Sequence, residues 1–271
     1  MPKLPLGLSR YKGFLLDIDG VLVRGKAVLA GAPGALAELK TRGHVLFLTN
    51  NSTKSRQGVA HHLRSLGFDI RAEEAVPSCY VAAQYLRHRY GLVRFWTLGE
   101  AGILEEMTLA GHIPVGPEEA QWIVVGMDRE LTYAKLAQAL RALLRGARFL
   151  ATNRDATFPT PDGLVPGAGA IVGALVGMGF EPEEVVGKPS LRSFEVALST
   201  LGLPPHEVLM IGDRLETDVL GAQKAGLDTA LVLTGISREQ DIAQEGIVPT
   251  WVADSLADLV RGKVRPGKAA L

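Results

Sequence analysis

The chain has 271 residues, of which 47% are hydrophobic and 21% charged. This is an ordinary globular composition with enough apolar material for one large or two smaller domains, and it excludes a disordered or fibrous protein. Lysine plus arginine and aspartate plus glutamate each total 29, so the formal net charge is zero. No basic surplus favours a nucleic-acid partner, and a phosphate site would have to be a local feature of a balanced surface.

Cysteine content and hydropathy indicate the cellular compartment in which the protein is expected. Cys79 is the only cysteine, which excludes an intramolecular disulfide and a cysteine metal cage. No stretch approaches the roughly 18 consecutive apolar residues of a membrane-spanning helix, and the first residues lack the pattern of a cleaved leader. We therefore expect a soluble cytoplasmic protein with no membrane partner.

The first part of the chain alternates short apolar runs with helical patterns. Residues 14–19 form an apolar run that ends in two acids, which predicts a buried parallel strand opening into a loop. A helix is expected over residues 31–42 and a second strand over 44–48, ending at Thr49. A second helix is expected over 55–66. This order predicts a doubly wound, Rossmann-like α/β core with a parallel sheet.

The middle of the chain, residues 91–182, has a pattern of its own. We expect strands at residues 93–98, 122–125 and 148–151, and helices at residues 99–110 and 133–145. These elements are sufficient for a smaller α/β domain inserted into the first. The core would then consist of residues 1–90 and 183–271.

The last part of the chain again alternates strands and helices, with a strand expected at 208–211, a helix at 218–225 and a strand at 229–233. Ligands of doubly wound sheets bind beyond the carboxyl ends of the strands. The residues that follow such ends here are Asp17, Asp19, Thr49 and Asp213. Their convergence predicts a site at this edge of the sheet.

Four aspartates are candidates for chemistry. Asp17 and Asp19 would project to the same face of a continuing strand, where two close carboxylates repel each other unless a cation such as Mg²⁺ is present. Asp213 can reach a metal from a strand end, and Asp218 can reach it from the first turn of the next helix. The structural alternatives are an Asp-Gly turn after the first strand, and a turn residue followed by a favourable first-turn charge at the second.

Phosphate donors follow two further segments. Thr49 and Asn50 offer a hydroxyl and backbone N–H groups at a strand end, although this loop could equally cap the next helix. Lys188 precedes another helix, with Pro189 predicted at its first position, so that the lysine would point into the same crevice. The alternative for an isolated lysine is solvation.

In this order the motifs resemble the haloacid dehalogenase superfamily, and in particular its branch of nagD-type and p-nitrophenyl phosphatases. The core motifs read LLDIDGVLVRG, LTNNST, GKPS and IGDRLETDVLGA. The inserted region carries VVGMDRELTYAKL and GARFLATNRDATFPTPDGLVPGAGA, which are similar to the cap domain of that branch. The resemblance extends across essentially the whole chain.

The resemblance implies a phosphatase that acts on a small phosphorylated metabolite. Asp17 would be the nucleophile that forms an aspartyl-phosphate, and Asp19 would be the general acid and base. Thr49, Asn50 and Lys188 would bind the phosphoryl group. An alkoxide leaving group needs a proton whereas a halide does not, so Asp19 also argues for ester hydrolysis on chemical grounds.

The resemblance also implies a magnesium cofactor and a cap. Mg²⁺ would be held by Asp17, the Asp19 backbone carbonyl and Asp213, with Asp218 acting through water or as an anchor. The insert would close over the strand ends, and its residues Asn153 and Asp155 would read the substrate. The alternative for these two is a structural Asx-turn. Dimerisation through the cap is expected for this branch.

Three other functions remain open at the level of sequence. A phosphotransferase acting on a sugar or nucleotide would use the same acids with a cap that excludes water. A phosphoaspartate signalling module would use similar groups, but such modules are shorter and lack an acid at the position of Asp19. A catalytically silent binding protein is disfavoured by the intact set of acids.

Overall fold

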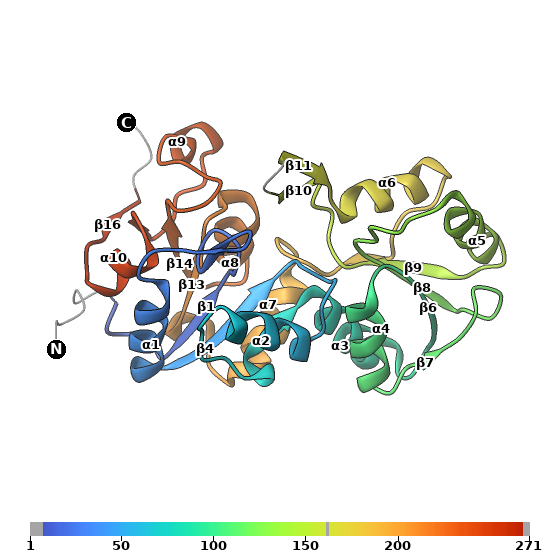
Figure 1. The fold of residues 1–271 in the computed structure, drawn as a ribbon, viewed down its shortest axis with the longest axis horizontal. Coiled ribbons are helices and arrows are strands. Elements are labelled where there is room, and N and C mark those ends of the chain that lie inside the picture. The colour runs from blue at the N-terminus through green and yellow to red at the C-terminus, as the bar shows by residue number, and fades with distance from the viewer. Residues whose placement is uncertain (1–7, 161–162, 268–271) are drawn as a thin grey trace. The chain divides into compact units, whose positions relative to one another are not determined.

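The computed structural model describes residues 8–160 and 163–267, which form two compact units (Figure 1). The first unit takes in residues 8–49, 62–75 and 193–267, and the second takes in residues 50–61, 76–160 and 163–192. The predicted insert, residues 91–182, lies inside the second unit, whose bounds are wider.

The first unit is built on a seven-stranded sheet with the strand order β16-β15-β14-β13-β1-β4-β5. The strands are β1 (Gly13–Leu16), β4 (His44–Thr49), β5 (Ala75–Pro77), β13 (Val208–Gly212), β14 (Asp228–Val232), β15 (Trp251–Ala253) and β16 (Arg265–Pro266). The strands from β4 through β1, β13 and β14 to β15 pair in parallel, and β16 closes one edge antiparallel. A separate hairpin joins β2 (Val23–Arg24) and β3 (Ala27–Val28). The predicted doubly wound parallel sheet is confirmed.

The central strands are continuous apolar runs because both faces of a parallel sheet are covered. In register, Leu16 of β1 pairs with Ile211 of β13 and with Phe47 of β4, and all three side chains are fully buried. The carboxyl ends of these strands therefore lie at one edge of the sheet. The residues that follow them emerge side by side, and this places the site.

Helices complete the first unit. They are α1 (Ala32–Arg42), α8 (Leu220–Lys224), α9 (Asp241–Glu245) and α10 (Leu256–Val260), with short 3-10 turns η1 (Ala72–Glu74) and η2 (Pro205–Glu207). α1 buries Ala35, Leu36 and Leu39 and packs against α10. Two further helices, α2 (Arg56–Ser65) and α7 (Leu191–Leu201), each contain one of the four points at which the chain passes from one unit to the other.

The second unit has a five-stranded parallel sheet in the order β12-β9-β8-β6-β7. Its elements are α3 (Ser78–Tyr90), β6 (Arg94–Leu98), α4 (Ala101–Leu109), β7 (Ile113–Pro114), β8 (Trp122–Val125), α5 (Tyr133–Leu144), β9 (Arg148–Ala151), β10 (Thr157–Thr160), β11 (Gly163–Pro166), α6 (Ala168–Gly177) and β12 (Glu184–Val185). Figure 1 shows α5 and α6 on one side of this sheet, with α3 and α4 on the other. The α5–α6 side encloses an apolar core that includes Ile123, Phe149 and Leu175. Residues 91–182 therefore contain strands and helices of their own, and the unit also takes in α3 and β12 outside that range.

Three local predictions were wrong. The strand predicted over 14–19 ends at Leu16, because the chain turns there. The helix predicted from Asp218 is preceded by a π-helical turn, Leu215–Val219, in which the Val219 N–H donates to the Arg214 carbonyl five residues earlier (3.2 Å). Pro189 does not open a helix: residues 187–190 form a turn closed by a bond from the Ser190 N–H to the Gly187 carbonyl (3.0 Å), and α7 begins only at Leu191.

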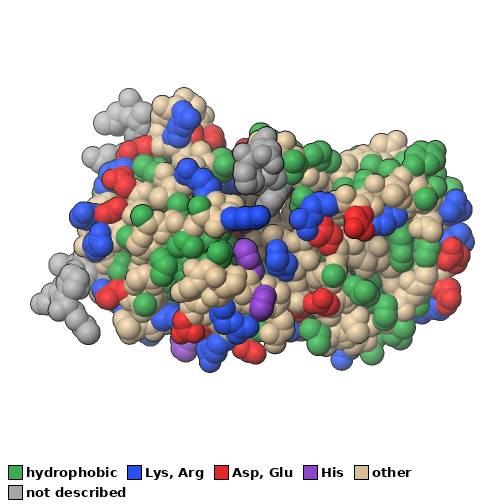
Figure 2. All heavy atoms as spheres, in the orientation of Figure 1, with side chains coloured by type: hydrophobic (Ala, Val, Ile, Leu, Met, Phe, Trp, Pro, Cys, Tyr) green, Lys and Arg blue, Asp and Glu red, His purple; other side chains and the backbone are tan. Residues whose placement is uncertain are grey.

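No helix among residues 8–160 and 163–267 is both long and apolar enough to cross a membrane. On the face that Figure 2 shows, lysine and arginine side chains are interspersed with aspartate and glutamate, as the balanced composition indicates.

Candidate active site

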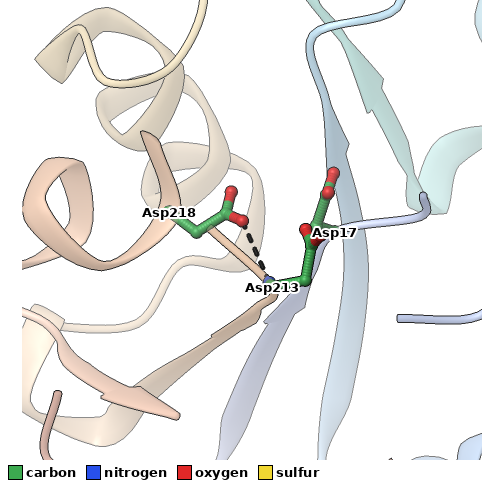
Figure 3. A group of neighbouring side chains, drawn as sticks. All are labelled: Asp17, Asp213 and Asp218. Carbon is green, nitrogen blue, oxygen red and sulfur yellow. Dashed lines mark hydrogen bonds between the residues drawn. The ribbon is translucent and has the colours of Figure 1, made fainter. Parts of the chain in front are cut away.

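Three aspartates gather where β1 and β13 end (Figure 3). Asp17 directly follows β1, Asp213 directly follows β13, and Asp218 lies in the π-helical turn. One carboxylate oxygen of each lies within 4.8 Å of the others, and the residues are 8%, 1% and 0% exposed. Buried carboxylates at this separation repel one another unless a cation lies among them. Because all the donors are hard oxygens, the residues fit a divalent cation such as Mg²⁺.

Asp17 continues the pairing of β1 with β13, and the chain turns directly after it. The Asp17 N–H donates to the Ile211 carbonyl (2.9 Å), and the Ile18 carbonyl then accepts the Leu22 N–H (2.9 Å), which closes a tight turn. Gly20 in this turn has φ 83°, and a Cβ there would overlap the Asp213 carboxylate. Glycine is therefore required after the second aspartate both by backbone conformation and by the proximity of Asp213.

Asp213 is held by the loop that follows β14. Its Oδ2 accepts the Ile236 N–H (2.8 Å), and its backbone carbonyl accepts the Ser237 N–H (3.0 Å). A Cβ on Gly235 would overlap the same carboxylate. The Thr234 hydroxyl donates to the Gly20 carbonyl, which links this loop to the turn after β1. Asp213, a candidate metal ligand, is therefore held by this loop through both its side chain and its backbone.

Asp218 fixes the backbone around Asp213. Its Oδ2 accepts the backbone N–H groups of Asp213 (3.2 Å) and Arg214 (3.1 Å), and Figure 3 shows the first of these bonds. A Cβ on Gly212 would overlap the Asp218 side chain. The Asp218 carboxylate is therefore a member of the cluster and also fixes the loop that carries Asp213.

Two other predicted site residues, Asp19 and Thr49, also belong to the first unit. Asp19 is half-buried and forms an isolated bridge with Val23. Within the described part of the chain, Asp19 lies outside the three-carboxylate group. Thr49 is the last residue of β4 and is buried.

The predicted residues of the second unit, Asn50, Asn153, Asp155 and Lys188, are joined by hydrogen bonds. The Asn50 amide Nδ2 donates to the Asp155 carboxylate (3.2 Å to each oxygen) and to the Lys188 carbonyl (3.0 Å). The Asp155 N–H donates to Asn153 Oδ1 (3.0 Å), which is an Asx-turn. Lys188 is buried.

Sequence reasoning missed the loop of residues 234–237. The signal was present, because Thr234 and Gly235 end the strand next to the one that carries Asp213. The sequence alone indicates no role for this loop, because neither threonine nor glycine is an acid.

Known proteins are similar to this chain over more than nine-tenths of its length. The haloacid dehalogenase-like hydrolase family matches residues 14–113, and a related HAD-hydrolase-like family matches residues 185–259. The sugar-phosphatase AraL of Bacillus subtilis is 36% identical over 252 residues, covering 92% of each chain.

Solved structures agree. A p-nitrophenyl phosphatase from Archaeoglobus fulgidus has a TM-score of 0.87 and 38% identity, covering 92% of this chain and 98% of that one. A glycerol phosphate phosphatase from Mycobacterium tuberculosis in complex with magnesium has a TM-score of 0.86 and 33% identity, covering 93% of this chain and 78% of that one. With the acid cluster at the sheet edge and this similarity over more than nine-tenths of the sequence, the chain belongs to the haloacid dehalogenase-like hydrolase family.

Proposed function

We propose that this protein is a magnesium-dependent phosphatase that hydrolyses phosphate monoesters of small metabolites, with sugar phosphates as the first substrate class to test. The observation that carries the proposal is the buried group of Asp17, Asp213 and Asp218 at the carboxyl edge of a parallel sheet. The names of the relatives support it, since they include a sugar phosphatase, a p-nitrophenyl phosphatase and a glycerol phosphate phosphatase.

Hydrolysis proceeds in two displacements in this proposal. A carboxylate oxygen of Asp17 attacks phosphorus, the ester P–O bond breaks, and the leaving alkoxide takes a proton from Asp19. Asp19, now a carboxylate, removes a proton from water, and the hydroxide attacks the phosphorus of the aspartyl-phosphate. Inorganic phosphate leaves, Asp17 is regenerated, and one ester and one water have become one alcohol and one phosphate.

The metal and the phosphoryl group would be held by separate sets of residues. Asp17, the Asp19 backbone carbonyl, Asp213 and Asp218 would hold Mg²⁺ directly or through water. When bound, Mg²⁺ supplies positive charge that neutralises the phosphoryl oxygens. Thr49, Asn50 and Lys188 would bind those oxygens, and residues 91–182 would act as a cap that selects the substrate.

A panel of phosphorylated metabolites, assayed for phosphate release with Mg²⁺ and with excess chelator, tests this function. We expect release that requires Mg²⁺ and that is lost in Asp17→Asn, because the amide forms no phosphoenzyme. Undiminished turnover in chelator or in Asp17→Asn would reject the proposal. Formation of a new ester instead of free phosphate would identify a transferase.

Asp19→Asn tests the acid–base role. We expect the rate to fall by about 10²–10⁴, and by less for p-nitrophenyl phosphate, whose leaving group needs little protonation. An equal loss for alkyl and nitrophenyl esters would show that Asp19 only positions the substrate.

We also propose a cytoplasmic location and a homodimer formed through the second unit. Exposed apolar side chains on α4 and β7, namely Leu104, Leu109 and Ile113, support the latter. Light scattering on the purified protein decides it, since a monomeric mass at micromolar concentration would contradict the dimer.

A further inference from the structure

We infer that Asn153 and Asp155 are positioning residues for the phosphoryl-binding groups Asn50 and Lys188, rather than residues that read the leaving group. The inference rests on the proposed function. Under this inference, Asn153 and Asp155 hold Asn50 and Lys188 in position. Their loss therefore weakens the binding of every phosphate ester to the same extent.

Three loops of the second unit meet at Asn50. They are the segment that begins with Asn50, the segment of residues 152–155 after β9, and the turn of residues 187–190. A Cβ on Gly187 would overlap the Thr152 carbonyl oxygen and come within 2.8 Å of Asn50 Oδ1. The loops are therefore in direct contact, and a displacement of one is transmitted to the others.

The backbone of Asn50 is fixed by two side chains. Its carbonyl accepts a hydrogen bond from Asn153 Nδ2 (2.8 Å) and another from the Ser78 hydroxyl at the start of α3 (2.7 Å). Both lone pairs of the carbonyl are thereby used. Asn153, which follows β9, and Ser78, which begins α3, therefore fix the orientation of the Asn50 peptide in the predicted phosphate-binding loop.

The side chain of Asn50 is fixed by Asp155. The Asn50 side-chain amide donates to the Asp155 carboxylate, a charge-assisted interaction, and to the carbonyl of Lys188. Asp155 is thus connected to the Lys188 backbone through one amide group. Loss of the carboxylate would release the Asn50 amide and, with it, a restraint on Lys188.

Both polar atoms of the Asn153 side chain already have partners in the protein. Its Nδ2 donates to the Asn50 carbonyl, its Oδ1 accepts the Asp155 N–H, and the residue is only 4% exposed. A residue that distinguishes one ester from another must present a polar or apolar group to the part of the substrate that varies. The contacts of Asn153 fit a support for Asp155 and Asn50.

Inorganic phosphate is the probe that separates the two roles, because it has the phosphoryl group and no leaving group. We expect Asn153→Ala and Asp155→Ala to weaken its affinity, measured calorimetrically with Mg²⁺ present, by about tenfold or more. The ratio of kcat/KM between p-nitrophenyl phosphate and a sugar phosphate should stay within about twofold of wild type.

Conservative and combined variants sharpen the test. Asp155→Asn keeps an oxygen that can accept from the Asn50 amide and should retain most of the phosphate affinity. In the pair Asn50→Ala and Asp155→Ala, the double variant should bind phosphate no more weakly than Asn50→Ala alone, because both act through one contact.

Asp128→Ala is a matched control. Asp128 follows β8 in the same unit, is buried, and forms the same kind of turn by accepting the Glu130 N–H (2.9 Å), but its carboxylate pairs with Lys135 (2.7 Å). This variant should lower the melting temperature and leave phosphate affinity unchanged.

A changed substrate ratio at unaltered phosphate affinity would overturn the inference and return Asn153 and Asp155 to substrate reading. A loss of melting temperature alone, as in Asp128→Ala, would also overturn it. A wild-type protein that neither hydrolyses an ester nor binds phosphate would instead reject the proposed function, and the inference with it.

Discussion

Gly235 lies against the carboxylate of Asp213, and its backbone leaves no space there for a side chain. In Gly235→Ala, either the loop that binds Asp213 through the Ile236 N–H moves away or the aspartate rotates. We expect Mg²⁺ affinity to fall by about tenfold or more, measured by titration calorimetry.

Gly34→Ala provides the control for that variant. Gly34 lies in α1 of the same unit, and a Cβ there would meet nothing within 4 Å. This variant should bind Mg²⁺ like wild type and gain about 0.4–1 kcal/mol of stability. Equal Mg²⁺ affinity in Gly235→Ala and wild type would show that the loop after β14 does not position Asp213.

His112 gives the stability a dependence on pH. Its Nδ1 accepts the Val93 N–H (3.2 Å), and its Nε2 lies 3.0 Å from the Ala83 carbonyl, so the ring is neutral with the proton on Nε2. Burial lowers the pKa of His112 below its usual 6.5. As pH falls below 6.5, the unfolded chain takes up a proton that the folded chain does not, and the free energy of unfolding decreases.

The expected slope from this one group is at most about 1.4 kcal/mol per pH unit. Urea unfolding of wild type and His112→Gln between pH 7.5 and about 5 measures it, since groups common to both proteins cancel in the difference. A difference in unfolding free energy that stays constant over this range would contradict the assignment.

The positions of the individual candidate acids could be predicted from the sequence, but the residues that contact Asp213 could not. Asp17 and Asp213 each end a buried apolar run, so their position at the sheet edge follows from the local sequence. The groups that hold Asp213 come from the end of β14, more than twenty residues away. That contact depends on β13 and β14 being adjacent in the sheet, which periodicity alone does not specify.

At the scale of elements, the start of α2 is held by a buried acid on α4. Glu106 is 1% exposed, and it accepts both the backbone N–H of Arg56 (2.7 Å) and its guanidinium Nε (3.0 Å). The same guanidinium lies over the ring of Tyr80, 4.2 Å from its centroid. Because the segment before Arg56 contains the predicted phosphate-binding loop, this ion pair bears on the site as well as on stability.

Glu106→Ala should lower the free energy of unfolding by about 1–3 kcal/mol, since it leaves the backbone N–H and the partly exposed guanidinium of Arg56 without their acceptor. Glu106→Gln should cost less, because its amide oxygen still accepts the Arg56 N–H. Urea denaturation of the two variants measures both effects. A loss below about 1 kcal/mol for the alanine variant would mean that water replaces the carboxylate.

Strands were predicted correctly where an apolar run had clear breaks on both sides. β8 and β9 were predicted with the bounds that they have, and β4 was short by one residue, because these strands are apolar runs between clear breaks. The hairpin of β10 and β11 was missed, since Pro159, Gly163 and Pro166 are typical of loops. The π-helical turn was missed because it depends on the bonds of Asp218 to the backbone.

For the whole molecule, metal binding should raise stability. If Mg²⁺ binds the folded acid cluster and not the unfolded chain, a concentration of 100 times the dissociation constant adds about 2.7 kcal/mol. For a chain of this size that corresponds to roughly 5–10 °C in melting temperature. Calorimetry with Mg²⁺ and with chelator measures the shift, and an equal shift in Asp213→Asn would place the metal elsewhere.

The division of the chain into units was the part least accessible from sequence. Residues 50–61 belong to the second unit although they follow β4 directly. Their place is set by tertiary contacts: a Cβ on Gly102 would lie 2.5–2.7 Å from backbone atoms of Lys54, and the Gly102 N–H donates to the Thr53 carbonyl (3.1 Å). Such contacts leave no periodic signal in the sequence.

The position of β1 between β4 and β13 has a consequence for synthesis on the ribosome. Gly13 pairs with His44 soon after both emerge, but its other partner is Val208. At roughly 5–20 residues per second, β1 waits about 10 to 40 s with one edge unpaired. Asp17 and Asp213 meet only after β13 has been synthesised, so a nascent or truncated polypeptide that ends before β13 has no acid cluster and exposes an apolar strand edge to chaperones.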